Sequence, residues 1–126
     1  MSKVQSNSDI GARLTEPDEL RFPAGYTTSK SWKRAQSEKA IAGPIDATRW
    51  KVQLGDGDLH AVLFTILGGK IRAECACRGY THHGFCAHVA RLWIRWTRCN
   101  LCVRDVDTDQ THRHPPAWIT VNDAST

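Results

Sequence analysis

The chain has 126 residues, enough for one domain with a modest hydrophobic core, and its hydrophobic content of 40% suggests that part of it lies outside that core. Its formal net charge of +4 permits an acidic partner such as nucleic acid but does not require one. No run of about 20 apolar residues could span a membrane, and the N-terminal residues lack the apolar segment of a secretory signal. We therefore expect a cytoplasmic protein, or a nuclear one in a eukaryote, where paired cysteines indicate a metal more often than a disulfide bond.

The N-terminal part of the chain is polar. Residues 1–17 have only scattered apolar side chains, which predicts a disordered tail. Residues 16–26 contain two prolines and three larger apolar residues, Leu20, Phe22 and Tyr26. This second stretch is expected to be an extended arm that can lie across the domain.

Residues 28–42 are predicted to form the first helix. Ser29 or Ser31 can cap its start, the following residues favour helix, and a Gly-Pro pair ends it. A thin apolar stripe would consist of Trp32, Ala35, Ala40 and Ile41. The cations of this stretch are Lys30, Lys33, Arg34 and Lys39. Such charges are most often a solvated face, and the alternative is a second surface that contacts phosphates.

Three strands are predicted after this helix. Residues 49–54 alternate between apolar and polar side chains, residues 59–67 are almost wholly apolar, and residues 70–75 form the third strand. Glycine-rich turns separate them, and the Gly-Gly pair after the second predicts a tight hairpin. His60 is a lone histidine in the central strand with no predicted partner. Cys75 is thus expected to be the last residue of the third strand, at the end of the sheet.

The sequence from Cys75 to His88 carries the strongest functional signal. It reads Cys-x-Cys, an eight-residue loop and Cys-x-His, which places Cys75, Cys77, Cys86 and His88 at the spacing of a four-coordinate structural zinc site. Cys75 and Cys77 point the same way in an extended strand, whereas Cys86 is expected just ahead of a helix whose first turn contains His88. Free core cysteines and a disulfide are the alternatives, but two tight pairs and an odd total of five cysteines favour a metal.

This pattern of Cys-x-Cys followed by Cys-x-His resembles the signature of SWIM-type zinc fingers. The apolar strands before it and the helix after it are also similar, so the resemblance covers about residues 33–98. It departs at Ala87, where the family often carries a basic residue. Together with the elements read from the chain itself, it predicts an α+β fold, in which a three-stranded antiparallel meander precedes a helix and another helix comes before the strands. The expected parts are a flexible tail and arm (1–27), a zinc-finger domain (28–104, with its zinc core at 49–98) and a C-terminal extension (105–126).

The segment over 89–98 predicts an amphipathic helix. Its apolar face, expected to pack on the sheet, is made of Val89, Leu92, Trp93 and Trp96. Its basic face is made of Arg91, Arg95 and Arg98. No Asp or Glu occurs between Cys75 and Arg104, so five arginines, a zinc ion and three thiolates would give this region a charge of about +4. This excess favours a polyanion site, although helical arginines usually serve only solubility.

A second and weaker metal signal follows this helix. Its four candidate ligands are Cys99, Cys102, His112 and His114. The residues around them suit a zinc knuckle poorly, and the alternative is two free thiols at the end of a helix. A redox Cys-x-x-Cys is less favoured, because no strand precedes it. Near the C-terminus, Trp118 is expected to anchor a short strand or arm.

These features favour a non-catalytic zinc module over an enzyme. Four protein ligands close the coordination sphere that a catalytic zinc leaves open, and the sequence has no zinc-deaminase motif, phosphate-binding glycine loop or His-Glu-x-x-His. The first hypothesis is binding of nucleic acid, most simply DNA, through Arg78, Arg91, Arg95 and Arg98. The alternative is a protein-interaction adaptor without direct nucleic-acid contact, which five tryptophans would suit. The resemblance to SWIM-type fingers implies that such an adaptor would work in a recombination, transposition or helicase complex. Neither a membrane nor a small-molecule substrate is expected.

Overall fold

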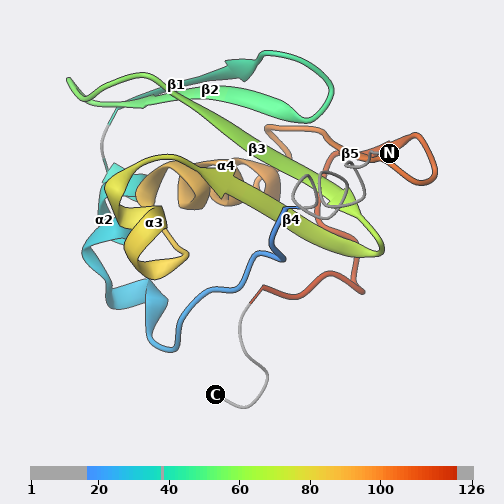
Figure 1. The fold of residues 1–126 in the computed structure, drawn as a ribbon, viewed down its shortest axis with the longest axis horizontal. Helices are drawn as coiled ribbons and strands as arrows, with labels where there is room; N and C mark the ends of the chain where they lie inside the picture. The colour runs from blue at the N-terminus through green and yellow to red at the C-terminus, as the bar shows by residue number, and fades with distance from the viewer. Residues whose placement is uncertain (1–16, 38, 122–126) are drawn as a thin grey trace, which may run out of the picture.

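The computed structural model describes residues 17–37 and 39–121, which form a six-stranded sheet with helices packed against it (Figure 1). In chain order the elements are η1 (Tyr26–Thr28), α2 (Lys30–Ser37), β1 (Ala40–Pro44), β2 (Arg49–Leu54), β3 (His60–Leu67), β4 (Lys70–Cys75), α3 (Arg78–His83), α4 (Ala87–Thr97), β5 (Val103–Asp105) and β6 (Gln110–His112). The mixed α+β class is confirmed. The tail predicted over 1–17 lies outside the described residues, apart from Pro17. No described helix combines the length and the hydrophobicity that crossing a membrane requires.

β3 is the central strand, because it pairs with three other strands. It runs antiparallel to β4 over six residue pairs, and its opposite edge pairs with β2 first and with β5 further along. β5 is parallel to β3, in register at Ile66 and Asp105. β1 and β6 extend the sheet by antiparallel pairing with β2 and β5. The expected sheet of three strands was therefore too small, since β1, β5 and β6 also belong to it.

The first helix is shorter than predicted. α2 ends at Ser37, and the chain pairs with β2 from Ala40 opposite Leu54 to Pro44 opposite Trp50. The prediction of helix up to residue 42 was wrong because long-range backbone pairing outweighs the modest helix propensity of these residues. A proline is tolerated at the end of an edge strand, where no neighbour needs its missing N–H.

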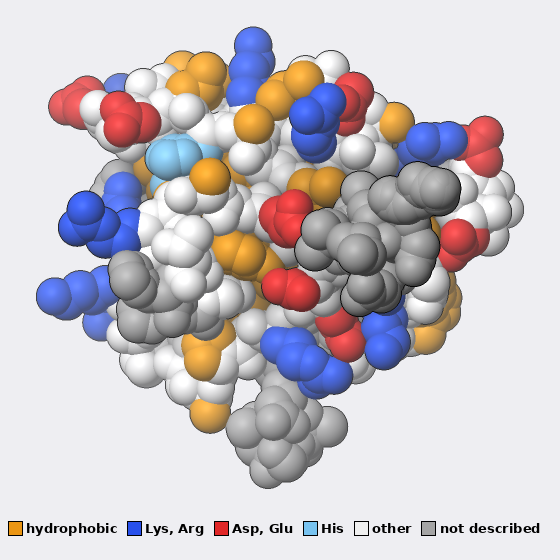
Figure 2. Space-filling model, viewed as in Figure 1, with side chains coloured by type: hydrophobic (Ala, Val, Ile, Leu, Met, Phe, Trp, Pro, Cys, Tyr) orange, Lys and Arg blue, Asp and Glu red, His pale blue; other side chains and the backbone are white. Residues whose placement is uncertain are grey.

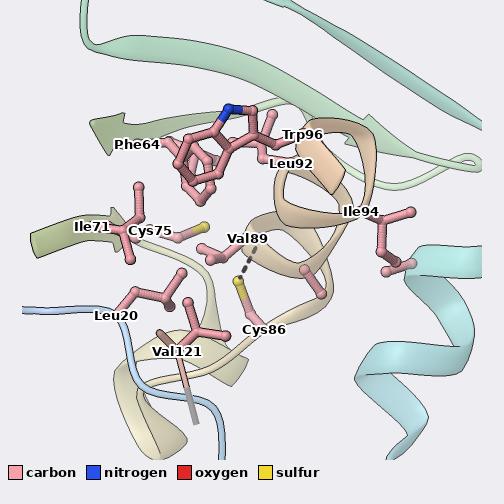
Figure 3. Close-up of a cluster of buried hydrophobic side chains, with 14 of the residues drawn as sticks. Leu20, Phe64, Ile71, Cys75, Cys86, Val89, Leu92, Ile94, Trp96 and Val121 are labelled. Carbon is pink, nitrogen blue, oxygen red and sulfur yellow. Dashed lines mark hydrogen bonds between the residues drawn. The ribbon is translucent and has the colours of Figure 1, made fainter. Parts of the chain in front are cut away.

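The core lies between the inner face of the sheet and α4 (Figures 1 and 3). Alternation along β3 buries three side chains, Val62, Phe64 and Ile66, as the sequence predicts. From α4, the fully buried side chains include Val89, Leu92 and Trp96. The rings of Phe64 and Trp96 meet edge-on with centroids 5.9 Å apart. α2 packs on the other side of α4, which leaves α4 largely enclosed.

The N-terminal arm is part of this core. It runs extended beside β4, where Asp18 O accepts a hydrogen bond from Ala73 N at 3.2 Å and Leu20 N donates to Ile71 O at 2.8 Å. Leu20 is 0% exposed and the next apolar arm residue, Phe22, is 1% exposed. Four aromatic rings surround that phenyl ring with centroids 4.8–6.1 Å away: Tyr26, Trp32, Phe85 and Trp93. The arm thus closes the end of the core that faces α2.

Candidate metal centre

The four side chains predicted as zinc ligands meet at one edge of the core. The Sγ atoms of Cys75, Cys77 and Cys86 and a ring nitrogen of His88 all lie within 4.8 Å of one another. Cys75 Sγ is 3.9 Å from His88 Nδ1. Neighbouring ligand atoms of a tetrahedral zinc site are about 3.5–3.8 Å apart, given the usual zinc–sulfur and zinc–nitrogen distances. The group is therefore close enough to bind a metal ion with little rearrangement.

Two of the candidate ligands also cap helices. Cys77 is the N-cap of α3, and its Sγ accepts a hydrogen bond from Tyr80 N at 3.4 Å. Cys86 is the N-cap of α4, and its Sγ accepts from Val89 N at 3.5 Å (Figure 3). The predictions that Cys86 precedes the helix and that His88 lies in its first turn are confirmed. Each sulfur thus sits at the positive end of a helix, and the N–H bond that it accepts partly offsets the contacts that raise its pKa.

The loop between the two ligand pairs contains a short helix, α3, that was not predicted from the sequence. α3 ends at Gly84, whose φ of 67° lies in the left-handed region and whose N–H donates to Tyr80 O at 2.7 Å. The Tyr80 hydroxyl donates to Ala73 O at 2.5 Å, which ties α3 to β4. Burial raises the pKa of Tyr80 to about 12, so the hydroxyl keeps the proton that this bond needs. α3 and its glycine turn thus fold the chain back from Cys77 to Cys86.

The three thiols differ in acidity. Cys86 hydrogen-bonds to Cys75, which lowers the pKa of Cys75 to about 4 and raises the pKa of Cys86. Burial raises the pKa of Cys77. Cys75, Cys86 and His88 are at most 9% exposed, and Cys77 is half-buried. In the absence of a cation, one thiolate and two thiols are therefore expected at neutral pH.

This difference predicts a steep pH dependence of metal binding. A metal ion must displace the protons of Cys77 and Cys86, whose pKa values are raised, but none from Cys75, whose pKa is lowered. Each displaced proton weakens binding tenfold per unit of falling pH, so we expect about a hundredfold loss of apparent affinity per pH unit around neutrality. Competition with a chromogenic zinc chelator at a series of pH values measures this slope. A slope near zero would show that all three thiols are already ionised.

The second predicted ligand set is not gathered into a site. Its members are Cys99, Cys102, His112 and His114. Among the residues that the structure describes, the group around Cys75 is the only one in which three or more His, Cys, Asp or Glu ligand atoms lie this close together. Both cysteines of the second set are exposed. His112 is the last residue of β6, and His114 lies just beyond it. The position of His112 is set by the pairing of β6 with β5, which does not bring it to the two cysteines.

The four arginines predicted to contact nucleic acid lie in different environments. Arg78 and Arg98 are exposed, whereas Arg91 and Arg95 are half-buried. One terminal nitrogen of Arg91 donates to Ala35 O at 2.7 Å and so joins α4 to α2. The Nε atoms of Arg91 and Arg95 are buried and have no hydrogen-bond partner among the described residues. The predicted basic face is therefore only partly exposed, because Arg91 takes part in the contact between α2 and α4.

One residue near the site was misjudged from the sequence. His60, expected to have no partner, places its ring against that of His88, with centroids 4.3 Å apart and planes tilted by 55°. The two histidines are distant in the sequence, and no motif spacing connects them. Only the antiparallel sheet and the packing of α4 on it bring the two rings together.

Comparisons with protein-family models, curated proteins and solved structures gave no significant match. The class of the protein is therefore defined by its own geometry. It is an α+β protein with a three-cysteine, one-histidine group that is close enough to bind a metal ion. The resemblance to SWIM-type fingers therefore depends on the spacing of these four residues and on the strands and helix that flank them.

Proposed function

We propose that the protein is a non-catalytic zinc-binding module of the SWIM type. The observation that carries this proposal is the approach of Cys75, Cys77, Cys86 and His88 within 4.8 Å. Three thiolates and an imidazole suit zinc better than magnesium or calcium, which prefer oxygen ligands. Four protein ligands would leave no position for a reacting water, so the ion would support the fold. It would hold the end of β4 and the starts of α3 and α4 together.

We further propose that the arginines of α4 bind nucleic acid. Support comes from Arg91, Arg95 and Arg98, none of which forms an ion pair with an acidic side chain in the described part of the chain. Burial and the positive charges of Arg95 and Arg98 lower the pKa of Arg91, which indicates mutual repulsion without a counter-charge. A phosphate would offset this repulsion.

The neighbouring helix adds positive charge. α2 packs on α4 and carries the exposed Lys30 and Lys33, and none of its first-turn residues is acidic. Figure 2 shows Lys and Arg side chains gathered along the edge of the molecule where α2 lies. A phosphate backbone running along the two helices could contact both sets of cations, with little dependence on base sequence.

Removing two positive charges from the C-terminal end of α4 tests this function. The double variant Arg95→Ala, Arg98→Ala is expected to weaken binding of a labelled DNA duplex and to reduce the slope of log K against log salt by about 2. Arg91 is left intact because its bond to Ala35 supports the fold. Fluorescence anisotropy across a salt series gives both quantities.

A matched control removes two cations elsewhere. Arg21→Ala, Lys70→Ala deletes side chains that are both paired with Glu19, and it should leave the salt slope nearly unchanged. Equal losses in both double variants would mean that only net charge matters. A wild-type protein that does not bind DNA or RNA at low salt would contradict the proposal.

The second candidate function is a protein-interaction adaptor in a DNA-processing complex. It is favoured by an open groove of about 790 Å³ beside the candidate metal centre. Its lining combines the apolar Leu63 with two acidic residues, Asp18 and Glu74, and one basic residue, Arg49, which is itself paired with Asp46. Figure 2 shows apolar side chains between acidic ones on this face. The carboxylates would repel phosphates, so this groove suits a peptide better than nucleic acid. Absence of any nucleic-acid binding would make this the preferred function.

A further inference from the structure

The contact between His60 and His88 carries a further inference. His60 is the first residue of β3, and its backbone is held by antiparallel pairing opposite Val52 of β2. Its ring lies 4.3 Å from the His88 ring, centroid to centroid. His88 is 9% exposed, whereas His60 is half-buried. His60 is thus the more exposed ring of the pair and covers part of the His88 imidazole.

The contact with His60 matters because of the direction in which the His88 ring points. Its Nδ1 faces Cys75 Sγ at 3.9 Å, so Nδ1 is the nitrogen directed toward the sulfur group. His60 is not a member of the four-residue group and so is not a fifth ligand. A ring packed against a ligating histidine limits the rotations that would carry the ligand nitrogen away, as neighbours of metal ligands commonly do.

We propose that His60 is a positioning residue, which holds the His88 imidazole in its ligating orientation and slows the loss of zinc. The inference rests on the proposed zinc site. With zinc bound, the three cysteines would be thiolates and His88 would be the one neutral ligand, so it would be the ligand most easily exchanged for water. Because the His60 ring is anchored to the sheet, release of the imidazole requires the two rings to separate first.

The test uses the full chain loaded with zinc. His60→Ala removes the ring, and His60→Phe keeps a ring but has no nitrogen. We expect zinc transfer to a chromogenic chelator to be about tenfold faster in the alanine variant and close to the wild-type rate in the phenylalanine variant. Leu59→Ala, which truncates an adjacent side chain that is 56% exposed, is the matched control and should release zinc at the wild-type rate.

A second measurement separates positioning from a general loss of structure. With cobalt in place of zinc, the visible absorption of the phenylalanine variant should match that of the wild type, since the ligand set is the same. An alanine variant as slow as the wild type, or a phenylalanine variant as fast as the alanine one, would overturn the inference. If the alanine variant does not fold, His60→Gln replaces it, with the same expected acceleration relative to His60→Phe.

The outcome for His60 is distinguishable from that for the zinc site itself. A wild-type protein that contains no stoichiometric zinc after expression in zinc-supplemented medium would contradict the proposed function. A wild-type protein that binds zinc, with unchanged release from every His60 variant, would contradict only the role of His60.

Discussion

Replacing Cys86 with serine is expected to abolish zinc binding and to unfold the protein at room temperature. Serine is among the best N-cap residues, so its hydroxyl can accept the Val89 N–H that Cys86 Sγ accepts now. The helix cap is kept, and one thiolate ligand is lost. A structural zinc contributes about 10–16 kcal/mol in apparent terms, which is comparable to the whole stability of a domain, about 5–15 kcal/mol. Packing alone is therefore not expected to replace it.

Two measurements check this result. Zinc content of the purified protein, by atomic spectroscopy, should fall from one ion per chain to none, and the far-ultraviolet circular dichroism should lose its cooperative melt. Cys102→Ser is the matched control, because Cys102 is exposed and lies outside the four-residue group. The Cys102→Ser protein should keep one zinc ion per chain and melt at the same temperature as the wild type. A Cys86→Ser protein that melts cooperatively near the wild-type temperature would show that the fold does not depend on the metal.

The candidate metal site was predictable from the sequence because its four ligands are close together along the chain. Cys75, Cys77, Cys86 and His88 lie within one short stretch, and the two-residue spacings already restrict the backbone around each pair. The strand periodicity of 2 and the glycine turns also predict β2, β3 and β4 well. The N-cap position of Cys86 follows from the need to direct both Cys86 and His88 at one ion.

What the sequence could not predict depends on contacts between distant segments. Residues 40–42 favour helix locally, yet they form β1 because β2 offers a partner edge. The contact of His60 with His88 exists only because α4 packs on the sheet. Arg91 looks like a surface charge on a helical wheel, but α2 covers that face and accepts its hydrogen bond through Ala35. In each case a tertiary neighbour, absent from the local pattern, determines the outcome.

Truncating Phe22 to alanine is expected to destabilise the zinc-loaded protein by about 3–5 kcal/mol. Phe22 is 1% exposed and lies among four aromatic rings, so the truncation leaves a cavity in the core. One of the four rings is that of Phe85, which directly precedes Cys86. The arm therefore supports the segment that presents the second ligand pair, even though it supplies no ligand.

Urea unfolding in excess zinc measures this loss, and zinc content measures whether the ligand set survives it. We expect Phe22→Ala to retain one zinc per chain, because the four ligands are unchanged, while its unfolding midpoint falls. Trp118→Ala deletes a larger aromatic side chain that is 53% exposed, and it should change the stability by less than about 1 kcal/mol. A similar small change for Phe22→Ala would mean that the arm contributes little to the fold. A large loss with intact zinc would show that the aromatic cluster stabilises the domain independently of the metal centre.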